Sequence, residues 1–316
     1  MNYTYFYKHK YHDPSELNGL LRYDVLLAGY VNSHRVQDPV THIPSDRIIW
    51  FAIDSEDKDL FLSDKEVVFV KVNDDYNPIL DKLRELSLPG KRVCLDCTGF
   101  RIPHLLFVMR CMMMLRVNKF DIIYTETPQY NNNEDTQFSD LLCEVKLMYG
   151  MSGIHTSRDD NDLLVIAAGY DNSRISDVAN SKKHTKKTLM LGFPSISPGM
   201  FQENILRAHE AEGALDSDCF KVMAANIYAP AYDPFVAAQE ISDYIEKLNR
   251  YKPITNIYLS PLSTKPHAIG MALYFLWESG FRKNISLIYP YCKRYITANS
   301  DEAGRIWRYE IELPAV

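Results

Sequence analysis

The residues best placed to bind an anion follow residues 254–259, an apolar run with the composition of a buried strand. Ser263, Thr264 and Lys265 come next, and Pro266 opens a helical segment. Hydroxyls, backbone N–H groups and a lysine thus gather at a helix amino end, where free N–H groups and the helix dipole favour anions. A lysine at this end of a helix is repelled by the positive end of the helix dipole. A bound phosphate would offset that repulsion and so gives a reason for the lysine. Ser/Thr capping with a surface lysine is the alternative interpretation.

A second candidate turn follows the apolar segment at residues 163–168. Asp171, Ser173 and Arg174 bring a carboxylate, a hydroxyl and a guanidinium into one turn. A nucleotide can use all three groups. A capped helix with Arg174 in its first turn explains the same residues without a ligand. Both interpretations stay open.

Two further strand ends carry groups that suit a nucleotide. Thr98 and Arg101 follow the expected strand at residues 92–97, and the arginine can bind phosphate through two parallel hydrogen bonds. Capping with an exposed arginine is the alternative there. Near the end of the chain, Tyr291 can stack on a base and Lys293 can meet a phosphate. Ordinary surface residues explain that pair equally well.

Three carboxylates at expected strand ends, Asp96, Glu126 and Asp171, are candidates for acid–base catalysis. Strand-end carboxylates can be brought together in one cleft, which predicts a nucleotide-processing hydrolase or glycosidase as an alternative to a binding protein. No Gly-x-Gly-x-x-Gly follows an early strand, so classical NAD chemistry is disfavoured. We find no metal-ligand constellation either, and the cofactor stays unknown.

The elements that must position these groups are short apolar runs that alternate with helical patterns, which indicates β-α-β units. We therefore expect an α/β, Rossmann-like fold with mainly parallel sheets flanked by helices. In such sheets, ligands bind outside the carboxyl ends of the strands. The expected strands span residues 24–30, 48–53, 67–71, 92–97, 120–125, 163–168, 188–191, 220–225, 254–259 and 285–289, with an antiparallel strand at 306–312.

A polar stretch at residues 155–162 marks the expected boundary between two Rossmann-like units. The N-terminal unit would span residues 1–155 and the C-terminal unit residues 156–316. We find no close sequence repeat between them. Residues 1–90 are the least legible part and are interpreted as an extension of the first unit.

Composition narrows the class of protein. Hydrophobic residues make up 46% of the chain and charged residues 24%, which predicts a packed core rather than global disorder. The net charge is −6 and no long basic tract is present, so general binding to duplex DNA is disfavoured. The start has no apolar signal-peptide core, and no apolar run reaches the roughly 20 residues that cross a bilayer. Six dispersed cysteines indicate reduced thiols, and we expect a cytoplasmic protein without membrane association.

The segment NIYLSPLSTKPHAIGMALYF, residues 256–275, resembles a motif of the CARF and SAVED group of Rossmann-like sensors in prokaryotic antiviral systems. In that group a strand ends in a small-residue loop that commonly contains Thr-Lys and precedes a helix. Thr264 and Lys265 match this element, whereas Leu262 and Ser263 stand where a glycine pair often occurs. The resemblance implies binding of a nucleotide or oligonucleotide signal, usually in an oligomer, with the output in a separate effector protein.

Three functions follow from these observations. The first is a sensor or adaptor for a nucleotide-like anion, in antiviral defence as the resemblance implies. The second is the nucleotide-processing enzyme. The third is a structural subunit of a larger complex, for which the 21 tyrosines and 14 phenylalanines permit large interfaces. We expect the sensor, because the Thr264 turn has a stronger physical rationale than any carboxylate pair.

Overall fold

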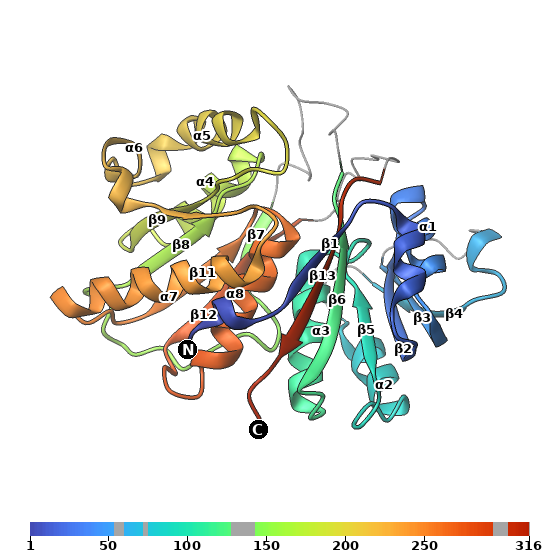
Figure 1. The fold of residues 1–316 in the computed structure, drawn as a ribbon. Helices are drawn as coiled ribbons and strands as arrows, with labels where there is room; N and C mark the ends of the chain where they lie inside the picture. The colour runs from blue at the N-terminus through green and yellow to red at the C-terminus, as the bar shows by residue number, and fades with distance from the viewer. Residues whose placement is uncertain (54–59, 72–74, 128–142, 293–302, 316) are drawn as a thin grey trace. The chain divides into compact units, whose positions relative to one another are not determined.

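The computed structural model describes residues 1–53, 60–71, 75–127, 143–292 and 303–315 (Figure 1). The chain forms two compact units. Unit 1 comprises residues 1–5 and 132–298, and unit 2 comprises residues 6–131 and 299–316.

The centre of unit 2 is a seven-stranded sheet with the strand order β1-β13-β6-β5-β2-β3-β4. Strands β2 to β6 run parallel, and β13 is antiparallel to both β6 and β1. The elements are β1 (Lys8–Tyr11), β2 (Tyr23–Tyr30), α1 (His34–His42), β3 (Ser45–Ile53), β4 (Glu66–Val70), α2 (Asn77–Glu85), β5 (Val93–Asp96), α3 (Ile102–Met114), β6 (Lys119–Thr125) and β13 (Ile306–Glu312), with short 3-10 turns at Pro14–Gly19 and Leu60–Leu62.

The centre of unit 1 is a six-stranded sheet with the order β10-β9-β8-β11-β12-β7, parallel except for β7. Its elements are β7 (Cys143–Leu147), β8 (Leu163–Ala167), α4 (Asn172–Ser181), β9 (Lys186–Gly192), α5 (Met200–Glu210), α6 (Asp218–Lys221), β10 (Ile227–Ala229), α7 (Pro234–Tyr251), β11 (Ile257–Pro261), α8 (Lys265–Glu278) and β12 (Ile285–Cys292), with 3-10 turns at Tyr3–Tyr5, Glu212–Ala214 and Met223–Ala225.

The two sheets share one topology. In chain order, the parallel strands of each sheet lie as third, second, first, fourth and fifth, followed by an antiparallel neighbour. The expected α/β, Rossmann-like fold with mainly parallel sheets is therefore confirmed. The direction of winding reverses between β2 and β5 and between β8 and β11, and ligands of such sheets bind at the carboxyl side of that switch point.

This shared topology reveals a short sequence repeat that the sequence analysis missed. Ala-Gly-Tyr-x-Asn-Ser stands at residues 28–33, across the end of the first parallel strand of unit 2, and again at residues 168–173, directly after the first parallel strand of unit 1. Pro-His opens the helix after the fourth strand in both units, at residues 103–104 and 266–267. The matches are short and far apart, so they become visible only when the topology pairs the elements.

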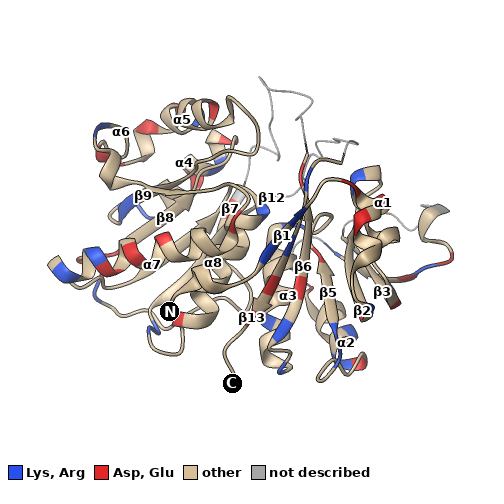
Figure 2. Ribbon diagram, viewed as in Figure 1, with Lys and Arg blue, Asp and Glu red and all other residues tan. Residues whose placement is uncertain are grey.

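Right-handed crossovers place the helices before the third parallel strand of each unit on one face of its sheet and the helices after that strand on the other. In unit 1, α4 and α5 lie on one side and α7 and α8 on the other (Figure 1). Helix α7 shows both charge signs along its exposed side, whereas α8 carries charge only near its ends (Figure 2). Helix α8 is buried from Pro266 to Leu276, and it packs against both the sheet and α7.

Glycines bring the first and fourth strands of each unit into close contact at their carboxyl ends. A Cβ on Gly99 would lie 1.9 Å from the carbonyl oxygen of Gly29, and a Cβ on Gly169 would lie 2.1 Å from that of Leu262. Any side chain at these two positions would overlap backbone, so only glycine allows the turns to touch. The close approach thus serves packing between two turns of the same unit.

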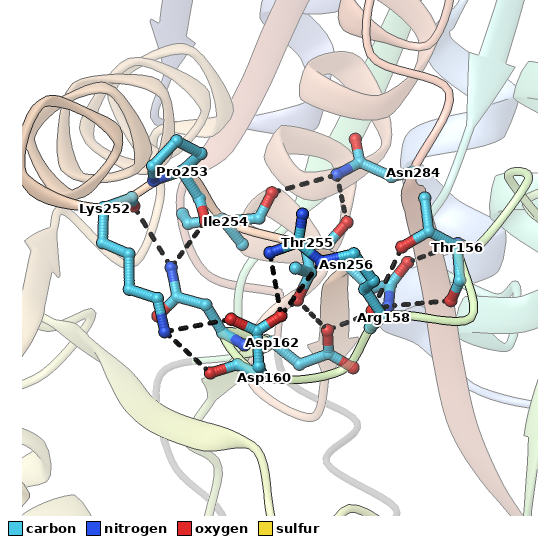
Figure 3. Close-up of polar contacts among 11 residues, drawn as sticks. Thr156, Arg158, Asp160, Asp162, Lys252, Pro253, Ile254, Thr255, Asn256 and Asn284 are labelled. Carbon is cyan, nitrogen blue, oxygen red and sulfur yellow. Dashed lines mark hydrogen bonds and ion pairs between the residues drawn. The ribbon is translucent and has the colours of Figure 1, made fainter.

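A polar network joins the amino ends of β8 and β11 (Figure 3). The side-chain amide of Asn256 donates to the carbonyl oxygen of Arg158 at 3.0 Å and to Asp162 Oδ1 at 2.9 Å. The Thr255 hydroxyl also donates to Asp162, and the Asn256 Oδ1 atom accepts from the N–H of Thr156 at 2.9 Å. The polar stretch at 155–162 is thus partly buried structure that fixes the two strands whose other ends carry the candidate site.

Several sequence expectations differ from the structure. The expected boundary at residue 155 lies beyond β7, which already belongs to the sheet of unit 1, while β13 returns to the sheet of unit 2. The strands that pair with β7 and β13 are far away in the chain or follow only after a long segment. The local sequence therefore does not show to which sheet either strand belongs. Residues 1–90 hold β1, β2, β3 and β4 and so supply strands of the sheet itself, both edges included, rather than an added layer. The strand expected at 220–225 is wrong, because α6 and a 3-10 turn cover it.

The cysteines follow the expectation only in part. Cys94, Cys97, Cys111 and Cys219 are free and buried, as expected of reduced thiols. The expectation is wrong for Cys292, which is disulfide-bonded. Its Cα partner across the antiparallel β12–β7 pair is Cys143. The strand pairing that brings these two positions together is not visible in the sequence. None of the described helices is long and apolar enough to cross a membrane.

Candidate functional site

Two of the predicted turns of unit 1, those after β8 and β11, meet at the carboxyl edge of its sheet. The end of β12, which carries Tyr291, lies beside β11 at the same edge. The backbone contact between Gly169 and Leu262 joins the two turns directly. Ser263, Thr264, Lys265 and Tyr291 are half-buried, so this edge is accessible. Lys293 lies outside the described residues.

The start of α8 offers an anion less than its sequence suggests. The Thr264 hydroxyl donates to the carbonyl oxygen of Ala231 at 2.6 Å and accepts from the N–H of His267 at 3.4 Å. Pro266 has no N–H to donate. The hydroxyl is therefore a helix cap, and the groups of this turn that can still face a ligand are the Ser263 and Lys265 side chains at the half-exposed rim.

The Asp171 turn has both a capping role and an unexpected reach across the sheet. Asp171 Oδ1 accepts from the N–H of Arg174 at 3.2 Å and from the Ser173 hydroxyl at 2.6 Å, which caps α4. Arg174 is buried, with its guanidinium over the ring of Tyr289 at 4.7 Å. Its Nη2 atom donates to the carbonyl oxygen of Pro290 at 3.4 Å. Arg174 thus connects the turn after β8 to the end of β12.

Two buried polar side chains at the ends of the loop at residues 260–267 were not among the ligand residues predicted from the sequence, where both stand beside apolar residues. Ser260 and His267 are 0% exposed. Among the described residues, the Ser260 hydroxyl and His267 Nδ1 have no hydrogen-bond partner. His267 Nε2 lies 3.3 Å from the carbonyl oxygen of Ala229 and 3.1 Å from that of Pro230, so Nε2 carries the proton. Burial lowers the pKa of His267 to about 4, and the imidazole is neutral.

The predicted residues of unit 2 form a separate, buried cluster at the carboxyl edge of its own sheet. Asp96 Oδ1 accepts from the N–H of Thr98 at 2.9 Å, and Thr98 Oγ1 accepts from the N–H of Thr125 at 3.0 Å. Arg101 is half-buried at the N-cap position of α3, without a side-chain capping bond. The hydroxyl of Thr125 is buried without a partner among the described residues.

Glu126 is committed to an ion pair. Arg305 Nε donates to Glu126 Oε2 at 2.6 Å, and Trp307 Nε1 donates to Glu126 Oε1 at 2.8 Å. The backbone of the segment before β13 also pairs with it, since the N–H of Gly304 donates to the Glu126 carbonyl oxygen at 2.8 Å. Glu126 is 2% exposed, and the segment closes this edge of unit 2.

Each carboxylate proposed for catalysis therefore has a structural partner. Asp96 and Glu126 lie at neighbouring strand ends of unit 2, whereas Asp171 belongs to unit 1. Among the residues that the structure describes, no group of three or more His, Cys, Asp or Glu side chains could hold a metal ion.

Comparison with known proteins adds little to this picture. No family model and no curated protein matches the chain. Among solved structures, an N-terminal ketoreductase from a macrolactin assembly line is similar over 89% of this chain and 72% of that chain, at 10% identity and a TM-score of 0.23. At that TM-score the likeness carries no argument about fold or function, so the function rests on the site itself.

Proposed function

We propose that unit 1 binds a nucleotide-like anionic ligand at the carboxyl edge of its sheet, and that the chain acts as a sensor or adaptor. The observation that carries the proposal is the meeting of the turns after β8 and β11, beside the last residues of β12, at one accessible edge. This edge lies at the switch point of an open parallel sheet, where ligands of such folds bind.

The side chains at this edge suit a nucleotide in kind. Lys265 supplies a cation for phosphate, and the half-exposed Tyr291 ring offers a face for a base. Because α8 is capped by Thr264 and carries Pro266, side chains rather than helix N–H groups would recognise the phosphate. Ser263 adds a hydroxyl at the rim.

The enzyme alternative receives less support. A catalytic carboxylate must be able to exchange a proton with a substrate. Asp171 caps α4 and Glu126 is paired with Arg305. Asp96 Oδ1 is engaged within its own turn, where it accepts from the N–H of Thr98 at 2.9 Å. The resemblance of residues 256–275 to CARF and SAVED sensors is the reason to propose a separate effector protein, an oligomeric assembly and a role in antiviral defence.

A thermal-shift screen tests this function. The purified chain is heated with ATP, NAD⁺, cyclic di-AMP and linear tetra-adenylate, each also with the Lys265→Ala and Lys247→Ala variants. Lys247 is an exposed lysine on α7, away from the turns of the site, and serves as the matched control. A ligand at a hundred times its Kd stabilises the native state by about 2.7 kcal/mol.

The sensor proposal expects a shift that Lys265→Ala abolishes and Lys247→Ala retains. A compound that is consumed during incubation would instead establish the enzyme. If no compound shifts the melting temperature, the sensor proposal fails and the structural subunit takes its place.

A further inference from the structure

Each unit has one arginine that connects the helix after its first parallel strand to the end of its fifth. Arg35 Nη1 on α1 donates to the carbonyl oxygen of Thr125 at the end of β6, at 3.4 Å. Arg174 on α4 makes the same bond to Pro290 on β12, also at 3.4 Å. Because β5 lies between β2 and β6, and β11 between β8 and β12, each arginine crosses the end of its fourth strand.

The residues beneath the two arginines occupy matching positions. Leu95 pairs with Ile122 and Leu259 with Leu287, so the next residues, Asp96 and Ser260, lie at the same level beside the fifth strand. Cys94 and Tyr258, two residues earlier, pack in the core clusters that contain α1 and α4. Side chains two apart on a strand share a face, so Asp96 and Ser260 both point toward those helices.

The pairing with the first strand differs between the units but does not alter this face. Ala28 pairs with Asp96, whereas Ile166 pairs with Ser260. Relative to the Ala-Gly-Tyr repeat, the register is thus shifted by two residues. A shift of two keeps every side chain on the same side of the sheet.

The two units therefore differ in one chemical respect at this place. In unit 2 the residue at this level of the fourth strand is a carboxylate, Asp96. Unit 1 has a serine there, shorter than aspartate and uncharged, and its buried hydroxyl has no partner among the described residues. Asp171 and Asp177 each stand three residues from Arg174 in sequence. Asp171 is directed to the amino end of α4, and the half-buried Asp177 lies within electrostatic reach of Arg174. A buried hydroxyl without a hydrogen-bond partner lowers the stability of the folded chain. A bound ligand that accepts its proton would remove this cost.

We propose that Ser260 and Arg174 form an anion-binding subsite, in which a phosphate oxygen of the ligand takes the place that the Asp96 carboxylate takes in unit 2. This inference rests on the proposed function and names the groups that recognise the phosphate. Ser260 donates its hydroxyl proton to the oxygen, and Arg174 supplies the positive charge. Lys265 then acts at the rim of the same site.

The swap of the two residues is the test. Inorganic pyrophosphate, which has no base or ribose, is titrated with the full chain while its ³¹P line width is followed, so that weak binding is detected. Ser260→Asp places an internal carboxylate in the subsite, as unit 2 does, and should weaken binding by at least about tenfold, since like charges within contact repel. Ser260→Ala removes one hydrogen bond and should weaken binding about fivefold.

Two controls separate charge from shape and from fold. Ser260→Asn has the size of the aspartate variant without its charge and should bind more tightly than Ser260→Asp. Asp96→Ser makes the reciprocal change in unit 2 and should leave the pyrophosphate affinity of unit 1 unchanged. Circular dichroism checks that each variant is folded, and Ser260→Ala keeps the test decisive if the aspartate variant unfolds.

The outcomes distinguish this inference from the proposed function. If nucleotides bind in a Lys265-dependent way but Ser260→Ala and Ser260→Asp bind pyrophosphate like the wild type, the subsite is overturned and the function stands. If pyrophosphate binds through Ser260 but no nucleotide shifts the melting temperature, the subsite stands and the function fails. Absence of pyrophosphate binding to the wild type overturns the subsite.

Discussion

The two units share a strand order but differ at the edge where a ligand would bind. In unit 2, Asp96, Thr98, Thr125 and Glu126 are all buried, and the segment before β13 covers the end of β6. In unit 1, the corresponding edge keeps Ser263, Lys265 and Tyr291 half-exposed. The topology places a potential ligand site in both units. The local side chains decide whether that site is occupied by the protein's own groups, as in unit 2, or stays accessible to a ligand, as in unit 1.

The largest effect is expected from the glycines that both units use to join their turns. Gly99→Ala should lower the free energy of unfolding by about 4 kcal/mol, because its Cβ would overlap the backbone of Gly29. Gly169→Ala should cost a similar amount against Leu262. Gly213, which has nothing within 4 Å of its Cβ position, is the control and should change stability by less than about 0.5 kcal/mol. Urea unfolding measures the free energy of unfolding of Gly99→Ala, Gly169→Ala and Gly213→Ala. If only one of the first two variants is destabilised, the turns of the two units are not equivalent.

The buried histidines should make stability fall as the pH falls. Burial lowers the pKa of His104 to about 3 and that of His267 to about 4. The unfolded chain binds protons from about pH 6.5 downward, where the folded chain does not. The contribution of neutral His267 is therefore complete above pH 6.5 and is lost as the pH falls toward 4, by about 2–3 kcal/mol. Urea unfolding of His267→Asn should show a shallower loss between pH 6.5 and 4; an unchanged slope would rule out this assignment.

The closed edge of unit 2 should depend on Glu126. Glu126→Gln keeps an acceptor for Trp307 but leaves Arg305 without its carboxylate. We expect a loss of about 2 kcal/mol, below that for a fully buried pair because Arg305 is half-exposed. Ser263→Ala at the open edge of unit 1 is the comparison and should be nearly neutral. Equal losses in chemical denaturation would contradict the distinction between closed and open edges.

The smallest effect concerns the cap of α4. Asp171→Ala should cost about 1 kcal/mol, since the N–H of Arg174 loses its acceptor. Asp171→Asn retains a capping oxygen and should cost less than about 0.5 kcal/mol. Thermal unfolding of the two variants measures the difference. If Asp171→Asn proves as costly as Asp171→Ala, the charge rather than the cap is what the turn requires.

The sequence by itself determined the class of fold and most of the strands. Apolar runs such as 163–168 and helix signals such as Pro266 are local, so periodicity and capping preferences reveal them. For the same reason the sequence placed Asp171, Arg174 and Lys265 at the starts of helices, after strands. Ser, Thr and Asp serve both as helix caps and as ligand-binding residues. The sequence therefore left open which of the two roles these residues have.

Only the tertiary structure decided which of these residues meet and which are already engaged. The exchange of β7 and β13 between the units, and the opposition of Cys143 and Cys292, depend on pairing between remote segments. The reach of Arg174 to Pro290 and the burial of Ser260 follow from the order of β8, β11 and β12. Hydrogen-bond partners across a sheet are set by which strands become neighbours, and no local pattern in the chain records that order.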